Sequence, residues 1–585
     1  MFPFQTSNYD DSNYSTFQDK FSLTNVSFYS LDVENINTKG SFYGVEERGE
    51  SAGVDTISSV NGLYQDNIWK QELPIPKYEQ QEQKQQSFSD YEQFDDLRFP
   101  ILSSQLQTCN GIEEVGPEKE KACPFSSLQL LKSHSNGFKQ FSSGRVIEPS
   151  NYTHYSSNKA VDEGLSTEQI MRIAGSRFIQ SAGQEVDVGF SFNHPFDSFS
   201  GLSDEDTKMV ELAISLLASA ENIGNQQFDR AGRLLKQCDL FASNIGNPVQ
   251  RVVYYFVEAL RERIDKETGK TTLKGLGKKQ SFDIDEAMMT PNLAVMASHQ
   301  LMPFGQIAQF AGIQAIEENV GNAKRIHIID LAIRNGIQWT VLMQALVSRG
   351  ECPLQLLKIT AIATTSAYFI KKTGKMLTSF AETMNLPFSF NIVEVSDFSA
   401  IKENLLEVDK EETIAVYAEF MPRSLIALPN RLDSVMKMIR NVNPCVMVFA
   451  EVEANHNSPT FVNRFIEALF FYSAYFDCLD ACFERDDQNR MIMESMYFGK
   501  GIRNTIAAEG EERIIRNVKL EVWRMFFARF GMEETELSSS SLFQAELVIK
   551  KFSFGDSCML DKDGKSLVFG WKGTPLHSLS AWKFR

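Results

Sequence analysis

A short stretch of the chain, residues 325–339, has the residue types of a cofactor site. It begins with an apolar run of four residues, Ile326, His327, Ile328 and Ile329. The run reaches a carboxylate at Asp330, a turn that contains Gly336 follows, and an amphipathic helix starts near Trp339. Nucleotide and S-adenosylmethionine sites are built from such a strand, acid, glycine turn and helix. The stretch therefore predicts either a functional cofactor site or the fold of such a site that now serves another function.

The turn departs from the glycine pattern that such a cofactor needs. The second, fourth and sixth positions after the acid are Ala332, Arg334 and Gly336, so a β-carbon and a long cation occupy two of the three. Glycines there would let the backbone approach the cofactor. The next strand should end in an acid for the ribose hydroxyls, but it ends in AIATTS, residues 361–366. We therefore expect no bound cofactor, and we expect Asp330 to cap the next helix or to hold the turn.

A second polar cluster follows a later apolar run. It contains Glu451, Glu453, Asn455 and His456. At the end of a parallel strand these groups would lie on the edge where α/β proteins bind ligands. They could form structural hydrogen bonds, or line a pocket together with Asp330. A metal is not predicted, because no further ligand group is positioned by the spacing.

Strands and helices alternate from residue 325 onward. Apolar runs predict strands at 326–330, 354–364, 388–395, 413–420 and 444–453, and helical spacing predicts helices between them and at 460–481. Later strands are expected at 545–552, 566–572 and 577–585. This order predicts an α/β fold with a Rossmann-like, methyltransferase-like, mostly parallel sheet, helices on both faces and an antiparallel C-terminal edge. His327, inside the first strand, is expected to be a hydrogen-bonded core histidine.

Helical spacing dominates residues 201–320. Ser203, with Asp206 three residues later, predicts the start of one helix, and Pro248 predicts the start of another. Their apolar stripes would pack into a helical cap subdomain, or in part against another chain. A loop between helices, residues 266–280, holds five lysines and three glycines and is read as a solvated basic loop or a weak import signal.

Several motifs in this order resemble the GRAS family of plant transcriptional regulators. The run IHIID resembles the family's VHIID motif, LSAWKF at the end resembles its SAW motif, and NLPFSF loosely matches its PFYRE region. The segments EANHNSPTF and RNTIAAEGEER are also typical of the family. The residues that carry the resemblance are Ile326, His327, Ile328, Ile329, Asp330, Gly336, Trp339, Pro387, Phe388, Glu453, Asn455, His456, Arg503, Glu509, Gly510, Trp523, Arg524, Trp571, Ser580, Ala581 and Trp582.

The resemblance covers residues 201–585 and carries expectations with it. It implies a cap with a leucine-rich region at 201–320 and a Rossmann-like core at 321–585. It implies a nuclear regulator without enzymatic activity, in developmental, hormone or symbiosis signalling. Expected partners are other GRAS proteins and transcription factors, in homo- or heterodimers, with promoter DNA contacted directly or through them. The chain has no DELLA motif, and the sequence of its GRAS-like region is more similar to the symbiosis-related branches of the family.

Composition and charge limit the alternatives. The net charge of −18 argues against a generic DNA-binding or membrane-binding protein. Residues 1–200 carry −13 of it, are rich in Ser, Asn and Gln, and are predicted to be mostly disordered, either as an activation segment or as a solvated tail. Eight cysteines without a CxxC pair fit reduced thiols, and no signal peptide or membrane span is predicted.

Three functional classes remain open from the sequence. The leading one is a transcriptional regulator that acts through protein partners. The second is a binding protein that responds to a small molecule through the old cofactor cleft. The third, an active S-adenosylmethionine-dependent methyltransferase, is disfavoured by the missing glycines.

Overall fold

The computed structural model describes residues 124–135, 165–182, 202–270, 293–349, 353–364 and 367–585, all within one compact unit. Most of the acidic segment 1–200 and of the basic loop 266–280 lies outside these residues. What the sequence predicts for them therefore stays a prediction.

One mixed sheet of nine strands organises the chain, in the order β3-β2-β1-β4-β5-β9-β8-β7, with β6 also paired to β9. The strands are β1 Arg325–Asp330, β2 Leu356–Ala363, β3 Phe388–Glu394, β4 Thr413–Glu419, β5 Val446–Val452, β6 Met532–Thr535, β7 Cys558–Asp563, β8 Ser566–Trp571 and β9 Thr574–Phe584. The first five pair in parallel, and the later ones pair antiparallel. This confirms the predicted mostly parallel sheet with an antiparallel C-terminal edge.

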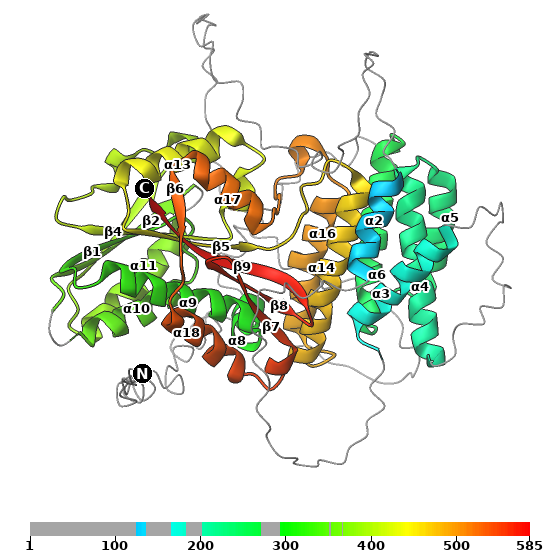
Figure 1. Cartoon of the computed structure of the whole chain (residues 1–585), viewed down its shortest axis with the longest axis horizontal. Coiled ribbons are helices and arrows are strands. Elements are labelled where there is room, and N and C mark those ends of the chain that lie inside the picture. The colour runs from blue at the N-terminus through cyan, green and yellow to red at the C-terminus, as the bar shows by residue number, and fades with distance from the viewer. Residues whose placement is uncertain (1–123, 136–164, 183–201, 271–292, 350–352, 365–366) are drawn as a thin grey trace, which may run out of the picture. The chain divides into compact units, whose positions relative to one another are not determined.

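Helices cover both faces of the sheet (Figure 1). Four of them share the larger hydrophobic core with one face of the sheet: α9 Pro303–Val320, α10 Ile337–Val347, α11 Tyr368–Thr383 and α18 Ser539–Lys550. The second core lies on the other face, under α13 Pro429–Val442 and α17 Leu520–Arg529. The parallel strands are buried between these layers, and their nearly continuous apolar runs follow from that.

A helical layer stands beside the sheet, at the right of Figure 1. It contains α2 Pro124–Ser135, α3 Thr167–Ala182, α4 Asp204–Gly224, α5 Phe228–Asp239, α6 Pro248–Glu267, α14 Phe461–Cys482 and α16 Gly499–Ile506. The Ser203 Oγ accepts a hydrogen bond from the Asp206 N–H at 3.0 Å, and α6 begins at Pro248 after a capping box, as predicted. Because α14 and α16 pack against α6, the layer does not follow the predicted boundary at residue 320.

Short elements complete the described chain. They are α8 Leu293–Leu301, α12 Pro422–Leu425, α15 Gln488–Ile492, the 3₁₀ helices η3 Phe398–Ala400, η4 Glu403–Leu406, η6 Gly510–Glu512 and η7 Gly555–Ser557, and the π-helix η5 Met493–Phe498.

Two helices lie where the sequence analysis predicted disorder. Helices α2 and α3 fall within 1–200, the segment that is predicted to be mostly disordered. The buried side chains of α3, Ile170, Met171, Ala174 and Phe178, follow helical spacing and pack in the main core. This apolar stripe was missed because the surrounding sequence is rich in Ser and Gln. A local signal was present, because Ser166 and Gln169 exchange side-chain-to-backbone hydrogen bonds in a capping box.

The predicted strand at 545–552 is also wrong. Residues 539–550 form α18, which begins after the Ser538 N-cap and packs on α9. The buried Ala545 and Val548, with Leu542 and Ile549 partly buried against the same core, follow the helical period. The β-branched Val548 and Ile549 favoured a strand by propensity, and tertiary packing overrode that preference.

Candidate functional site: the carboxyl edge of the sheet and its seam with the helical layer

The turn after β1 is held by the side chain of Asp330. Its Oδ1 accepts a hydrogen bond from the Ala332 N–H at 3.1 Å, and its Oδ2 accepts one from Trp339 Nε1 at 2.8 Å. Asp330 is 1% exposed, and Trp339 is fully buried. Both carboxylate oxygens are therefore engaged by the chain itself, and Asp330 holds the turn and the start of α10.

Asp330 and Glu419 end neighbouring parallel strands, β1 and β4, at the point where the strand order reverses. Open α/β sheets bind ligands at such a point. Burial raises the pKa of Asp330 to about 7, although the hydrogen bonds from Trp339 and Ala332 favour its ionised form. Burial also raises the pKa of Glu419, which accepts a hydrogen bond from the Tyr417 hydroxyl at 3.2 Å. Asp330 could exchange a proton near neutral pH, but both acids are buried and bonded to their own chain.

Gly336 and His327 have structural environments. Gly336 adopts φ +70°, and a β-carbon there would lie 2.7 Å from Thr373 Cγ2, so the turn requires glycine. His327 Nδ1 lies 2.9 Å from Glu412 Oε2, and its Nε2 lies 2.8 Å from Thr360 Oγ1. Burial is the main cause that lowers the pKa of His327 to about 4. It is a hydrogen-bonded core histidine, as expected.

The two acids after β5 also bind backbone N–H groups. Glu451 Oε1 accepts from the Arg423 N–H at 3.0 Å, and Glu453 Oε2 accepts from the Leu520 N–H at 2.9 Å, at the N-terminus of α17. Burial raises the pKa of Glu453 to about 7. The sequence left two alternatives for this cluster, structural hydrogen bonds or a pocket lined together with Asp330. The contacts of these two acids are structural hydrogen bonds. Asn455, which follows, is exposed.

His456 marks the start of a seam between the sheet and the helical layer. It is 1% exposed, its Nδ1 lies 3.0 Å from Asn517 Nδ2, and its carbonyl accepts from Arg513 Nη1 at 3.3 Å. Burial lowers the pKa of His456 to about 4, so the ring is neutral at physiological pH. The seam therefore joins two sequence motifs that lie about 50 residues apart.

Glu509 binds two arginines at the same seam. Arg464, on α14, and Arg263, on α6, both bind its Oε1, the latter at 2.7 Å. Arg464 Nη1 also donates to the carbonyls of Ser458 and Pro459 at 2.9 and 3.1 Å. Burial opposes ionisation of Glu509, but the charges and hydrogen bonds of the two arginines prevail and lower its pKa. One motif acid thus connects three segments.

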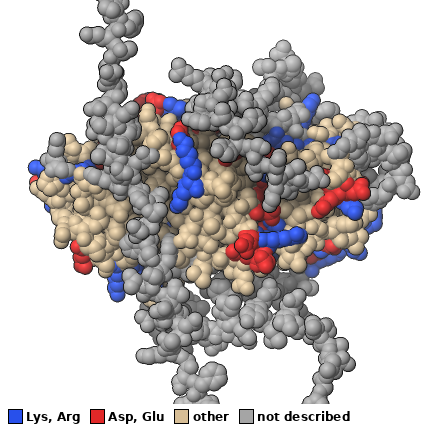
Figure 2. Space-filling view, turned by 90° about the horizontal axis from the view of Figure 1, so that it is seen from below, with Lys and Arg blue, Asp and Glu red and all other residues tan. Residues whose placement is uncertain are grey.

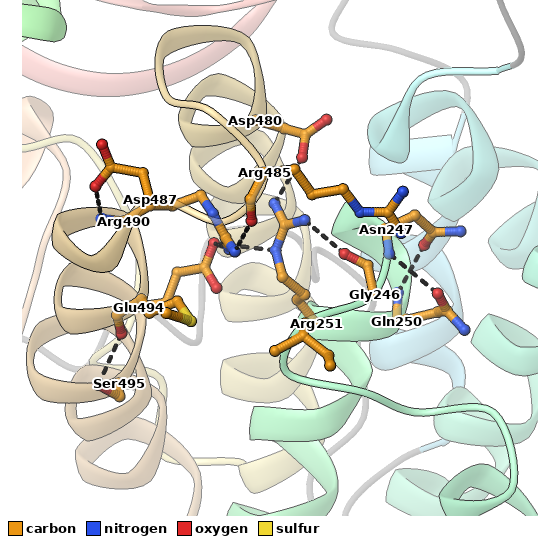
Figure 3. A network of polar contacts seen from close by, with 12 residues as sticks. Gly246, Asn247, Gln250, Arg251, Asp480, Arg485, Asp487, Arg490, Glu494 and Ser495 are labelled. Atoms are coloured by element: carbon orange, nitrogen blue, oxygen red, sulfur yellow. Dashed lines mark hydrogen bonds and ion pairs between the residues drawn. The ribbon is translucent and has the colours of Figure 1, made fainter. Parts of the chain in front are cut away.

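A buried ionic network also lies in the helical layer (Figure 3). Arg251, on α6, donates from Nε to Glu494 Oε1 and from Nη2 to Asp480 Oδ1, each at 3.0 Å, and Arg490 Nη1 donates to the same Glu494 oxygen at 2.7 Å. The side chains of Arg251, Arg490 and Glu494 are all fully buried. Glu494 lies in the π-helix η5, an irregularity that is frequent at functional sites. The sequence analysis missed this network. Arg490 and Glu494 have the i,i+4 spacing of a helical ion pair, but no local signal pairs them with Arg251, 243 residues from Glu494.

The remaining motif residues are spread over the fold. Trp523, on α17, is buried against Phe449, and Arg524 binds Glu534 and Asp563. The C-terminal motif lies in β8 and β9, where Trp571, Ser580, Ala581 and Trp582 are buried. The Pro387 carbonyl accepts from the Leu357 N–H at 2.8 Å, and Phe388 begins β3. Arg503 is half exposed and pairs with Glu262, while Gly510 begins η6 with φ +54°.

The arrangement offers no assembled catalytic constellation in the described part of the chain. No group of three His, Cys, Asp or Glu side chains there could hold a metal ion. None of the helices described is both long and apolar enough to cross a bilayer. The polar side chains described at the carboxyl edge and at the seam form hydrogen bonds and ion pairs within the chain itself. Their role is therefore to connect the sheet with the helices around it.

Comparisons with known proteins agree with this architecture. A sequence profile of the GRAS domain family matches residues 212–583. DELLA protein GAIP from Cucurbita maxima is 28% identical over 449 residues, which cover 75% of this chain and 74% of that protein. DELLA protein GAI1 from Vitis vinifera is 30% identical over 65% of this chain, and the match spans just under two thirds, 63%, of that relative. The crystal structure of SCL7 from Oryza sativa aligns with a TM-score of 0.56 and 25% identity, over 64% of this chain and 99% of that one.

Proposed function

The chain belongs to the GRAS domain family, and from this premise we propose that it is a nuclear transcriptional regulator of plants that acts through protein partners. The partners would be other GRAS proteins and transcription factors, in homo- or heterodimers. Developmental and hormone signalling are the processes that the family relationship favours, and symbiosis signalling is the narrower possibility raised by the motif wording.

One observation carries the choice of a regulator over a cofactor-dependent enzyme. Both oxygens of Asp330, the acid at the strand end, already accept hydrogen bonds from the chain itself, from the Ala332 N–H and from Trp339 Nε1. The turn also carries side chains at Ala332 and Arg334, where a cofactor would need glycine. These features support the interpretation that this strand, turn and helix serve as a structural scaffold and not as a cofactor site.

Charge supports contact with promoters through partners. The net charge of the chain is −18, and a protein that binds DNA through its phosphates usually gathers basic side chains on one surface. On the face drawn in Figure 2, the basic side chains of the described residues stand beside acidic ones and form no continuous basic surface. We therefore place direct DNA contact second to recruitment by a DNA-binding partner.

A tethering experiment tests the regulator directly. The full chain, fused to a heterologous DNA-binding module, should activate a reporter gene in plant nuclei. The aromatic residues among the N-terminal acids would contact the transcription machinery, so Phe17→Ala with Phe21→Ala should weaken the reporter several-fold. The matched variant Asn13→Ala with Asn25→Ala should retain full activation. A silent reporter with the fusion well expressed in nuclei would contradict the proposed activation.

A binding measurement distinguishes the proposed regulator from the methyltransferase alternative. Calorimetric titration of the purified full chain with S-adenosylmethionine should give no heat of binding at micromolar ligand. Micromolar affinity, together with methyl transfer to a nuclear protein that is lost in Asp330→Asn, would replace the regulator with a methyltransferase.

A further inference from the structure

A groove between α11 and β3 lies at one edge of the sheet, and its two walls differ in chemical character. Its volume is about 770 Å³, and its lining includes Phe390 and Ile392 on β3 and Tyr368, Lys371, Lys372 and Lys375 on α11. The tyrosine and the three lysines are exposed, whereas the two β3 side chains are half-buried. The groove therefore combines an apolar floor with a basic wall.

Strand β3 is the last strand on its side of the sheet, so one of its edges, the open edge, faces no other described strand. The Pro387 carbonyl accepts from the Leu357 N–H at 2.8 Å, and the Val395 N–H donates to the Ala363 carbonyl at 2.9 Å, so residues 387 and 395 face β2. Backbone polar groups of successive strand residues alternate in direction. Those of residues 388, 390, 392 and 394 therefore point to the open edge, where a further strand can pair with them.

Helix α11 packs closely against β3 and carries its lysines at a spacing that a strand can match. A β-carbon at Gly374 would lie 2.4 Å from Phe390 Cδ1, so the absence of a side chain lets the helix approach the strand. Lys371 and Lys375 are about one helical turn apart, which corresponds to ~6 Å along α11. Alternate residues on one face of a strand are ~6.6 Å apart. Two acidic side chains at alternate positions of an added strand therefore match these two lysines.

One of these lysines already binds a carboxylate that β3 presents. Lys371 Nζ lies 3.1 Å from Glu394 Oε1, and the two side chains are 61% and 59% exposed. An exposed ion pair of this kind contributes at most ~1 kcal/mol, so it exchanges partners readily. The basic wall is thus within reach of acidic side chains at the edge of the sheet.

Charge and backbone geometry together select the kind of occupant. A second copy paired through its own β3, in a continuous antiparallel sheet, would bring another α11 and its lysines to the same face, where like charges repel. Nucleic acid offers phosphates to the lysines but no peptide backbone to the open edge. An acidic peptide in extended form offers both, and its side chains alternate between the two faces of the sheet.

We propose that an acidic, extended segment of a partner protein docks in this groove as a strand added to β3. Its backbone pairs with the outward N–H and carbonyl groups of residues 388–394, and acids at alternate positions pair with Lys371, Lys372 and Lys375. The intervening side chains are apolar and extend the second core, which includes Val393 on the opposite face of the sheet. This inference rests on the proposed function, because it assigns a surface and a chemistry to one of the regulator's protein partners.

Fluorescence anisotropy with the full chain tests the basic wall. The probe is a labelled synthetic peptide in which valine and glutamate alternate, and it should bind with micromolar affinity. Lys371→Glu with Lys372→Glu and Lys375→Glu should lower the affinity on the order of tenfold, because attraction becomes repulsion. Reversal of three exposed lysines elsewhere is the matched control and should leave the affinity unchanged: Lys208→Glu, Lys236→Glu and Lys324→Glu.

The same measurement on Glu394→Ala tests competition within the groove. This variant removes the carboxylate that pairs with Lys371 and keeps the backbone of β3. It should raise the affinity for the acidic peptide by a few-fold. A peptide in which lysine replaces glutamate should bind the parent chain at least tenfold more weakly than the acidic peptide does.

N-methylation of the peptide tests the added strand. Methyl groups on the backbone nitrogens of two adjacent central residues remove an N–H from each of its edges, so an N–H that faces β3 is lost whichever way the strand runs. This peptide should bind on the order of tenfold more weakly, whereas methylation of the two terminal residues should have little effect. Equal affinity of the centrally methylated peptide would show a purely electrostatic contact and would overturn the added strand.

The remaining outcomes separate this inference from the proposed function. Failure of the acidic peptide to bind, or equal binding to the triple-lysine variant with an unchanged melting temperature, would overturn the docking. If the tethered full chain still activates the reporter in that case, the proposed regulator stands and only the groove is excluded as its docking surface. Peptide binding with a silent reporter would instead support the groove and contradict the proposed activation.

Discussion

At the scale of single residues, the side-chain carboxyl groups at the sheet edge are titratable groups that the fold largely removes from water. Asp330, Glu419 and Glu453 lie at or just after the ends of parallel strands, and burial raises the pKa of each. An acid whose pKa is raised in the folded state binds its proton more tightly there than in the unfolded chain. Such an acid makes the free energy of unfolding fall as the pH rises through the interval between the two pKa values.

Asp330 allows a direct test of this linkage. Its pKa moves from 3.8 to about 7 on folding, so its contribution to stability is full below pH 3.8 and is lost as the pH approaches 7. One pKa unit corresponds to ~1.4 kcal/mol, so the loss is on the order of a few kcal/mol. Asp330→Asn should remove this part of the pH dependence in denaturant unfolding of the full chain between pH 4 and pH 8.

The slope with pH is the informative quantity in that test. Asparagine cannot accept hydrogen bonds from both Ala332 and Trp339 without turning a donor toward one of them, so the variant should also lose ~1–3 kcal/mol at every pH. Asp486→Asn, at an exposed position, should reproduce the parent curve. A variant at Asp330 with the parent's full pH slope would show that this carboxyl does not titrate on unfolding.

At the scale of elements, buried ion pairs as well as apolar packing connect the helices of the helical layer to one another. Arg251 on α6 and Arg490 on α15 share the single buried carboxylate of Glu494 on η5. Burial raises the pKa of Glu494, while the charges of the two arginines oppose that rise. A buried ion pair adds little over apolar packing, but removal of one partner leaves an uncompensated charge in the interior.

Glu494→Gln should therefore destabilise the protein by ~3–5 kcal/mol, because the two buried guanidinium groups lose the carboxylate that they share, and Arg251 keeps only its pair with the partly exposed Asp480. The measurement is denaturant unfolding of the full chain, with the exposed Glu521→Gln as the matched control. A double-mutant cycle with Arg251→Met should show a coupling of ~0.5–3 kcal/mol, since the two side chains are in contact. Additive losses would mean that the network does not join α6 to η5.

The elements also show which parts of the fold the sequence predicts. The five parallel strands were predictable because burial on both faces gives each a nearly continuous apolar run, as in VMVFAEV of β5. Helix α18 was not, because Val548 and Ile549 have strand propensity and only the packing on α9 decides between the two forms. At the site, Asp330 was predictable from its place after a strand. The contact of Glu509 with Arg263 was not, because their separation of 246 residues leaves no local signal.

At the scale of the whole molecule, the last strand holds the two halves of the sheet together. Strand β9 pairs with β5 of the parallel half and with β6 and β8 of the antiparallel half. Trp582 lies opposite Met447 on one side and Glu534 on the other, and its ring centroid is 4.7 Å from that of Phe527. A strand so placed is ordered although it ends the chain.

Trp582→Ala should lower the melting temperature of the full chain markedly. The side chain is 2% exposed, and its Nε1 donates to Ser580 Oγ at 2.8 Å, so truncation leaves a cavity in the second core and removes one hydrogen bond of the Ser580 hydroxyl. Truncation of a core Trp to Ala costs ~3–5 kcal/mol, out of a typical stability of ~5–15 kcal/mol. Partner binding should fall in parallel with folding, as followed by thermal unfolding and a pull-down at the same temperature. Arg585→Ala, at the exposed end of the chain, is the control. If Trp582→Ala melts like the parent and yet loses a partner, the residue is an interface anchor, and the structural role argued from β9 is wrong.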